Sequence, residues 1–361
     1  CTNKINQSQN ITIASSGKIE SIDPARVSTL KSYQLLNALG DTLYELNNKG
    51  ELIPRLADSK PIISEDKLKI SIKLKKNILF HDGTPFDSSS MKFTIERFQN
   101  IGTLNYILNK KIKSIETPTK ELLIINLNNP SSSIEGLLTS INLTPISPKF
   151  YKDHFDKFLN NNFIGTGKYK LKRFSNEIQT LSPNKSYWGN KIKNNGINFI
   201  GYNSSSALYG AFISKRVDVL LSNSIEDTLR YKLNLLNQKK EIHESKSKPI
   251  EISFISLRTN KKPLNNIDIR LAIAKSLNRE LIRDKVSFSL RSSASSLIPL
   301  ILKNDNSVFW PDFDPKESKR IFREQGYCDG KIFNLPLTYR SNVPTDKLIA
   351  FYWQQSVKAE M

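Results

Sequence analysis

Residues 67–86 read KLKISIKLKKNILFHDGTPF, and this stretch decides the fold class because it places a strand signal directly before a turn signal. Across residues 67–75 apolar and polar side chains alternate strictly, which is typical of a β-strand with one buried face and one wet face. The Asp-Gly and Thr-Pro pairs in residues 81–85 predict a turn. Residues 88–98 then show helical spacing after a run of serines that can cap a helix. A strand, a turn and a helix in succession indicate a mixed α/β fold.

Strand and helix signals keep alternating along the rest of the chain. We expect strands at residues 11–14, 122–127, 217–221 and 250–254, and helices at residues 32–46, 268–286, 315–325 and 346–360. A glycine turn at residues 165–167 is expected to lead into a further strand. The chain has 361 residues, and a domain takes roughly 100–200, so there is room for two or more domains.

The composition describes a basic globular chain. Lys and Arg number 54 against 34 Asp and Glu, a net charge of +20, and hydrophobic residues make up 38%, which excludes a wholly disordered chain. Such a charge invites comparison with polyanion-binding proteins, since phosphate neutralisation by Lys and Arg drives association with nucleic acid. The basic residues are scattered and form no Arg-rich tract, so we expect a solvated basic surface and no nucleic-acid partner. No stretch approaches the roughly 20 apolar residues of a membrane-spanning helix.

The two cysteines, Cys1 and Cys328, are too few for a disulfide framework. Cys1 is informative because cleavage of a bacterial lipoprotein signal peptide leaves the lipid-bearing cysteine as the first residue. The polar residues 2–10 would then tether a domain to the membrane, with the lipid chains held in the bilayer. The alternative is an arbitrary first residue. Cys328 lies in a turn-like segment, where we expect an unpaired thiol.

The sequence contains no recognisable catalytic group. Three histidines occur, His81, His154 and His243, and no two of them lie at metal-ligand spacing with a cysteine or carboxylate. There is no Gly-x-Ser-x-Gly motif, and the Ser-x-x-Lys matches lack the companion Lys-Thr-Gly motif. His81 beside Asp82 is better explained as part of a turn than as an acid–base pair. The sequence therefore indicates a protein that is not an enzyme and carries no cofactor or metal.

Several short segments, taken in order, resemble one protein family. They cover residues 43–46, 50–59, 78–86, 164–169, 184–189, 262–264, 268–274 and 313–315. Each segment is weak alone, but their order and spacing hold from about residue 20 to the end. On these segments the chain resembles the extracellular solute-binding proteins of family 5, which serve ABC importers and include oligopeptide-, dipeptide- and nickel-binding members.

The resemblance implies a periplasmic binding protein of type II, a multi-lobed α/β (Venus-flytrap) fold with an extra inserted domain. Residues 1–10 would be the lipoprotein tether, residues 11–45 and 166–258 a discontinuous domain I, residues 46–165 the inserted domain II, and residues 259–361 domain III. Family members run further than this chain does. The resemblance therefore also implies a C-terminal truncation that leaves domain III and the return to domain I incomplete.

The same resemblance implies a function. Ligand would bind in a cleft between domains I and III, and the candidate ligand contacts are Val27, Ser28, Thr29 and Leu30, which follow the first Asp-Pro pair. The alternative is an ordinary solvated loop before a helix. The chain would be a monomeric, lipid-anchored receptor that captures peptides and delivers them to the permease of an ABC importer. It would lie in the periplasm or at the outer face of the cytoplasmic membrane. Two alternatives stay open: a nickel- or metallophore-binding member of the family, and a basic surface-anchored protein that binds polyanions or acts as an adhesin.

Overall fold

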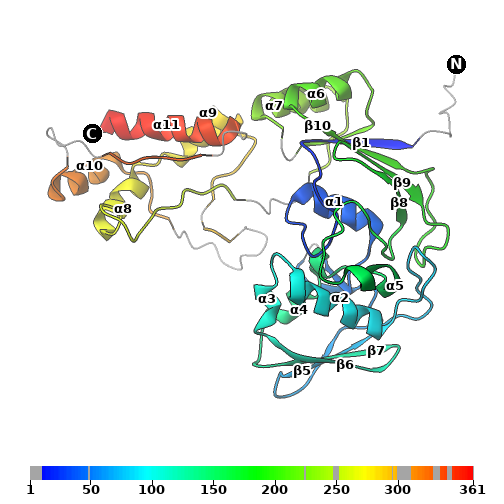
Figure 1. Cartoon of the computed structure of the whole chain (residues 1–361). Coiled ribbons are helices and arrows are strands. Elements are labelled where there is room, and N and C mark those ends of the chain that lie inside the picture. Colours follow the sequence, from blue (N-terminus) through cyan, green and yellow to red (C-terminus); the bar gives the residue numbers. More distant parts are fainter. Residues whose placement is uncertain are drawn as a thin grey trace. The chain divides into compact units, whose positions relative to one another are not determined.

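The computed structural model describes residues 10–47, 49–222, 225–246, 252–294, 296–298, 310–327, 334–339 and 344–360 (Figure 1). The chain divides into two compact units, Cys1–Asn223 and Ser224–Met361. Cys1 and Cys328 lie outside the described residues. Among the residues that are described, no helix is both long and apolar enough to span a membrane.

The first unit is built around a five-stranded sheet with the strand order β11-β1-β10-β9-β8. Its strands are β1 (Ile11–Ser16), β8 (Tyr169–Phe174), β9 (Ile178–Pro183), β10 (Ile197–Tyr202) and β11 (Val219–Leu221). β1 pairs in parallel with both β10 and β11, whereas β9 pairs in antiparallel fashion with β8 and β10. The strands expected at residues 11–14 and 217–221, and the strand after the glycine turn, are confirmed.

Two helices cover opposite faces of this sheet: α1 (Leu30–Leu39) and α6 (Ser205–Ile213) (Figure 1). Successive residues of β1 belong to different cores, because side chains alternate between the faces of a strand. Ile13 packs in the core that contains α1, and Ala14 packs in the core that contains α6. The sheet is thus covered on both faces around β1.

A second, antiparallel sheet of the first unit has the strand order β4-β5-β7-β6. Its strands are β4 (Ile62–Ile63), β5 (Lys69–Lys73), β6 (Ile112–Thr119) and β7 (Leu122–Leu127). α2 (Ser88–Ile101) belongs to the same core, which buries Ile70 and Ile72 of β5 as the alternation predicts. Asp87 caps α2 through Ser90, so the cap residue precedes the serine run that we expected to supply it.

Shorter elements connect the two sheets of the first unit. The strands β2 (Tyr44–Leu46) and β3 (Leu52–Pro54) form a hairpin. The short helices are α3 (Tyr106–Asn109), α4 (Ile134–Leu137), η1 (Ile141–Leu143), α5 (Pro148–Tyr151) and η2 (Lys152–His154).

The described part of the second unit contains helices and no strand. The helices are α7 (Asp227–Gln238), α8 (Ile267–Lys275), α9 (Arg279–Ser287), α10 (Pro315–Glu324) and α11 (Pro344–Glu360). Ile269, Phe322 and Trp353, from three of these helices, share one core. The helices expected at residues 315–325 and 346–360 are confirmed.

Three expected elements are wrong at least in part. The helix expected at residues 32–46 ends at Leu39, because Gly40 turns extended and residues 44–46 pair with β3 instead. The helix expected at residues 268–286 is two helices, because Asn278 accepts a hydrogen bond from the Leu281 N–H and starts a new one. Of the strand expected at residues 250–254, the last three residues are in no strand, and the first two lie outside the described residues.

The mixed α/β class is confirmed, whereas the expected domain boundaries stay a prediction. Within the first unit, one sheet takes its strands from residues 11–16 and 169–221, and the other from residues 62–127. This arrangement is compatible with an insertion between β1 and β8. The lipoprotein tether expected at residues 1–10 falls almost wholly outside the described residues.

Candidate functional site

The carboxyl ends of the three parallel strands of the first unit meet at one edge of the five-stranded sheet. β1 leads from this edge into α1 on one face, and its neighbour β10 leads into α6 on the other face. Where the connections of adjacent parallel strands diverge in this way, α/β proteins have a crevice that binds ligands. This edge, with the loop of residues 17–30 that follows β1, is therefore the candidate site.

The first residues of this loop make close contacts with β10 and α1. The Gly17 N–H donates to the carbonyl of Tyr202 at 2.6 Å, and Lys31 Nζ donates to the Lys18 carbonyl at 2.9 Å. Gly17 has a φ of +81°, and a Cβ there would lie 2.4 Å from Lys31 Nζ, so glycine suits both the turn and the contact. Burial lowers the pKa of Lys31, an effect that the charge of Glu20 partly offsets.

The four candidate ligand contacts lie together at the start of α1. Val27 is 2% exposed and packs in the core beneath α1, so its side chain faces the interior. Thr29 caps α1: its hydroxyl oxygen accepts from the Ser32 N–H at 3.4 Å and its O–H donates to Ser32 Oγ at 3.0 Å. Ser28 is exposed and Leu30 half-buried. Their contact with a ligand stays a prediction.

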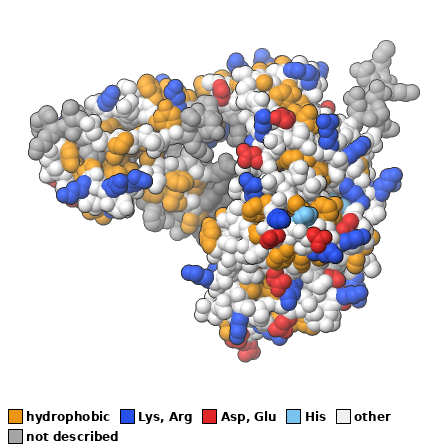
Figure 2. All heavy atoms as spheres, in the orientation of Figure 1, with side chains coloured by type: hydrophobic (Ala, Val, Ile, Leu, Met, Phe, Trp, Pro, Cys, Tyr) orange, Lys and Arg blue, Asp and Glu red, His pale blue; other side chains and the backbone are white. Residues whose placement is uncertain are grey.

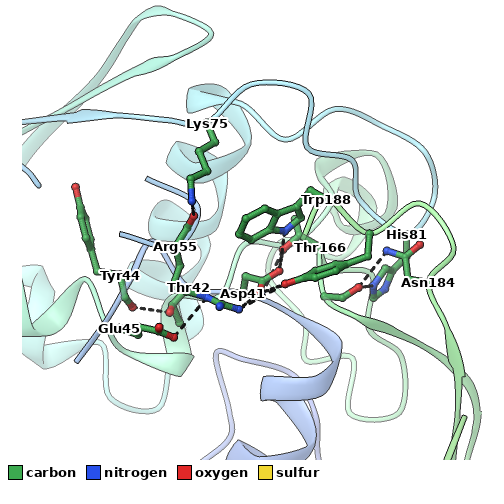
Figure 3. Close-up of polar contacts among 12 residues, drawn as sticks. Asp41, Thr42, Tyr44, Glu45, Arg55, Lys75, His81, Thr166, Asn184 and Trp188 are labelled. Carbon is green, nitrogen blue, oxygen red and sulfur yellow. Dashed lines mark hydrogen bonds and ion pairs between the residues drawn. The ribbon is translucent and has the colours of Figure 1, made fainter. Parts of the chain in front are cut away.

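A buried carboxylate ties together distant segments of the first unit (Figure 3). Asp41 is 5% exposed and accepts four hydrogen bonds. One oxygen accepts from Arg55 at 2.6 Å and from the Tyr187 hydroxyl at 3.1 Å, and the other accepts from the Trp188 indole at 3.0 Å and the Thr166 hydroxyl at 3.2 Å. Burial raises the pKa of Tyr187, with the charge of Asp41 acting in the same direction. Because all four donors come from the chain itself, we assign this cluster a structural role.

Sequence reasoning missed the Asp41 cluster. Trp188 is half-buried: it packs against the core that contains Tyr44, and its N–H donates to Asp41. The partners of Asp41 lie between 14 and 147 positions away, so no local spacing could have revealed them.

The first unit has two hollows, and the first includes Glu20 of the candidate loop. One of about 430 Å³ is lined by Glu20, Phe158, Leu159, Asn160, Asn161, Phe174, Ser175 and Asn176. The other, of about 630 Å³, lies beside Trp188 and is lined in part by Lys73 and Lys75. Lys73 pairs with Asp58 at 3.1 Å, and Lys75 donates to the Arg55 carbonyl at 2.6 Å while lying 4.8 Å from the Trp188 ring. The ammonium groups of these two lysines are thus engaged within the chain.

His81 is also held by backbone groups of the first unit. Its Nε2 donates to the Gly167 carbonyl at 3.1 Å, and its Nδ1 accepts from the Gly165 N–H at 3.4 Å, which fixes a neutral tautomer. Burial lowers the pKa of His81 to about 4. Asp82 closes the adjacent turn, as expected, by accepting from Thr84 and Ser147. His81 and Asp82 therefore do not form an acid–base pair.

The neutral His81 makes stability depend on pH. In the unfolded chain its pKa is near 6.5, so below that pH protonation favours the unfolded state. The free energy of unfolding is therefore unaffected by this histidine above pH 6.5, and it decreases as the pH falls from 6.5 toward 4. We expect a loss of about 2 kcal/mol between pH 7.5 and 5.0. Urea unfolding of the wild type and of His81→Gln at both pH values measures it. Equal pH dependence in the two proteins would contradict the prediction.

The chain matches the family model "Bacterial extracellular solute-binding proteins, family 5 Middle" over residues 51–359. The chain belongs to this family. Members of family 5 are solute-binding proteins of ABC importers that work outside the cytoplasm, so the interpretation that the chain is not an enzyme is confirmed. The resemblance inferred from the ordered segments is confirmed as well.

Three relatives illustrate the match. The glutathione-binding protein GsiB of Salmonella paratyphi A is 22% identical over 355 residues, which cover 97% of this chain and 67% of GsiB. The structure of NikA from Brucella suis in complex with Fe(III)-EDTA has a TM-score of 0.85 at 20% identity and covers 98% of this chain and 73% of NikA. DppA from Helicobacter pylori in complex with the peptide STSA has a TM-score of 0.74 at 23% identity and covers 88% of this chain and 66% of DppA.

These comparisons confirm the fold expected for family 5, a periplasmic binding protein of type II. This family 5 chain spans about two thirds of the length of GsiB and of DppA. In the described part of the chain, no group of three or more His, Cys, Asp or Glu side chains is placed to hold a metal ion.

Proposed function

We propose that this family 5 chain captures peptides at the carboxyl edge of its five-stranded sheet and passes them to the permease of an ABC importer. The observation that carries the proposal is the position of the loop of residues 17–30 at the divergence of β1 and β10. Ser28 is exposed at this loop, next to the first turn of α1. Ser28, Thr29 and Leu30 are the proposed contacts, with Val27 supporting them from the core.

The chemistry of the edge suits a peptide. An extended peptide can satisfy its main-chain groups by pairing with protein backbone, which leaves its side chains less constrained. The N-terminal turn of α1 carries backbone N–H groups without partners in the helix, and these favour a carboxylate nearby. The relatives support the same class of ligand, since GsiB is named for glutathione, a tripeptide, and DppA was solved with a four-residue peptide.

We further propose that Cys1 bears a lipid that holds the monomeric receptor at the outer face of the cytoplasmic membrane or in the periplasm. Delivery to the permease then follows from population shift: a ligand that binds one conformation of the receptor more tightly increases the share of that conformation. The permease can then recognise the conformation that the ligand favours. Metabolic labelling with an alkyne fatty acid, compared between the wild type and Cys1→Ser expressed with a lipoprotein signal peptide, tests the anchor.

The basic charge does not favour a polyanion partner. On the face drawn in Figure 2, Lys and Arg side chains of the first unit are spread among acidic, apolar and other side chains. A site for nucleic acid or another polyanion gathers its positive charge on one face. Scattered Lys and Arg residues, such as the sequence shows along its whole length, serve solubility and general association instead.

Peptide binding is tested by a thermal-shift screen of the chain from Thr2 onward. We expect one pool among peptides of two to eight residues to raise the melting temperature, because ligand that binds only the folded state stabilises it by about 2.7 kcal/mol at 100 times Kd. The matched control is the same amino acids supplied free. A shift with a nickel–histidine complex alone would favour the metallophore alternative. A shift with heparin alone that vanishes at high salt would favour the polyanion alternative.

A further inference from the structure

Residues far away in the sequence hold, through hydrogen bonds, the loop that carries the proposed ligand contacts. Asp23, directly before the turn of residues 24–26, is fully buried and accepts from both terminal nitrogens of Arg97, at 2.9 and 2.7 Å. The same carboxylate accepts from the Ala25 N–H at 3.0 Å and the Leu159 N–H at 2.7 Å. The Asp23 carboxylate therefore bonds both within the loop, at Ala25, and to the distant residues Arg97 and Leu159.

Asn142 holds the next part of the loop. Its side-chain nitrogen donates to the Pro24 carbonyl at 2.7 Å and to the Val27 carbonyl at 2.9 Å, so one amide bridges two loop carbonyls. Asn142 is 4% exposed and lies in η1. The Tyr33 hydroxyl of α1 lies 3.3 Å from the Val27 carbonyl and 3.3 Å from the side-chain oxygen of Asn142. The Val27 carbonyl comes directly before the exposed Ser28.

Backbone groups complete the support. The Thr103 N–H donates to the Ala25 carbonyl at 2.9 Å, and the Ile22 N–H donates to the Asn160 carbonyl at 2.9 Å. Arg97, Thr103, Asn142 and Asn160 all lie within residues 46–165, the segment that the family resemblance predicts to be an inserted domain. Hydrogen bonds therefore join this segment to six consecutive residues of the loop, 22–27, directly before Ser28.

We propose that Asn142 is a positioning residue for the ligand: it holds the backbone at Val27 so that Ser28, Thr29 and Leu30 present fixed contacts. This inference rests on the proposed function. A loop that is already ordered loses less conformational freedom when ligand binds, so a preorganised loop binds more tightly than a mobile one. On this view the inserted segment contributes to affinity without touching the ligand.

The test compares Asn142→Ala with Asn184→Ala. Asn184 is a matched control because it is also 4% exposed and also donates from its side chain to a backbone carbonyl, that of Gly167, outside the loop. For the peptide found in the screen, we expect Asn142→Ala to raise Kd at least tenfold and Asn184→Ala to leave it within twofold, at a comparable loss of melting temperature. Equal Kd values for the two variants would overturn the inference.

A second readout needs no ligand. Amide hydrogen exchange at residues 25–31 should be at least tenfold faster in Asn142→Ala than in the wild type, and unchanged in Asn184→Ala. Unchanged exchange in both variants would overturn the inference even if the proposed function holds. Faster exchange in a protein that binds no peptide would support the positioning role and contradict the proposed function.

Tyr33→Phe provides a milder variant if Asn142→Ala does not fold. It removes the hydroxyl that contacts the Val27 carbonyl and keeps the half-buried ring. We expect the same two effects at a smaller size, a Kd increase of about threefold and faster exchange confined to residues 25–31. Exchange that increases uniformly across the first unit would show loss of stability and contradict a local role.

Discussion

Replacing Arg97 by Met is expected to lower the free energy of unfolding of the first unit by about 3–5 kcal/mol. The reason is the charge that the substitution leaves behind. Asp23 is 0% exposed and Arg97 1% exposed, so removal of the guanidinium leaves a buried carboxylate without its countercharge. The substitution also removes a hydrogen bond of 2.6 Å to the Lys157 carbonyl and the contact with the Tyr151 ring, whose centre lies 5.0 Å away.

The effect of Arg97→Met is measured by hydrogen exchange of peptides from α2 as a function of urea, which reports on the first unit alone. Arg173→Met is the matched control, since Arg173 is exposed on β8 and its loss should change stability by less than about 0.5 kcal/mol. The double variant Asp23→Asn with Arg97→Met should recover part of the loss, because the stranded charge is then absent. A loss below about 1 kcal/mol in Arg97→Met would contradict the role assigned to the pair.

Gly167→Ala is expected to destabilise the first unit by about 3 kcal/mol or more, through close packing of backbone on backbone. A Cβ at Gly167 would lie 2.2 Å from the Leu39 carbonyl carbon, 2.4 Å from Gly40 N and 2.6 Å from the Leu39 oxygen. These atoms cannot move aside as the end of a flexible side chain would. In addition, the Gly167 carbonyl accepts from both His81 and Asn184, so a displaced Gly167 would disturb both contacts.

The matched control for Gly167→Ala is Gly210→Ala. Gly210 lies within α6, and a Cβ there would meet no atom within 4 Å. Alanine should therefore stabilise α6 by roughly 0.5–1 kcal/mol, because glycine costs more conformational entropy in a helix. Melting temperatures of the two variants, measured together, should move in opposite directions. Two variants that both melt near the wild type would show that the contact between Gly167 and Leu39 relaxes freely.

Local patterns predicted those elements of the fold that local interactions determine. The alternation across residues 67–75 identified β5, and the helical signal of residues 315–325 identified α10, which the structure shows to be capped by Asp314. The pattern failed at Gly40, where apolar residues continue at helical spacing but the helix ends. Gly40 takes an extended conformation there and packs closely against distant residues, since a Cβ at this position would lie 2.2 Å from Thr144 and would also press on Phe163. Such packing across 100 residues leaves no trace in the local spacing.

The candidate site was predictable only in outline. The resemblance located the loop after Asp23, but it did not distinguish the buried Val27 from the exposed Ser28. It also gave no indication of Asn142, whose partners lie 115 and 118 positions away. Side chains that shape a loop from a distance become visible only when the chain is folded, since a lone asparagine between Ile141 and Leu143 has no distinctive pattern.

The placement of β1 at the inside of its sheet has a consequence for the order of synthesis. Ile11 pairs with Ile197 and Ile13 with Val219, so the first strand finds no partner in its sheet until residues near 200 have left the ribosome. At 5–20 residues per second this delay is roughly 10–40 s. The antiparallel sheet has a shorter delay, because all its strands lie within residues 62–127. During this time β1 is unpaired, so the sheet of the first unit cannot close, and a chain whose sheet has not closed can still be threaded through a membrane channel.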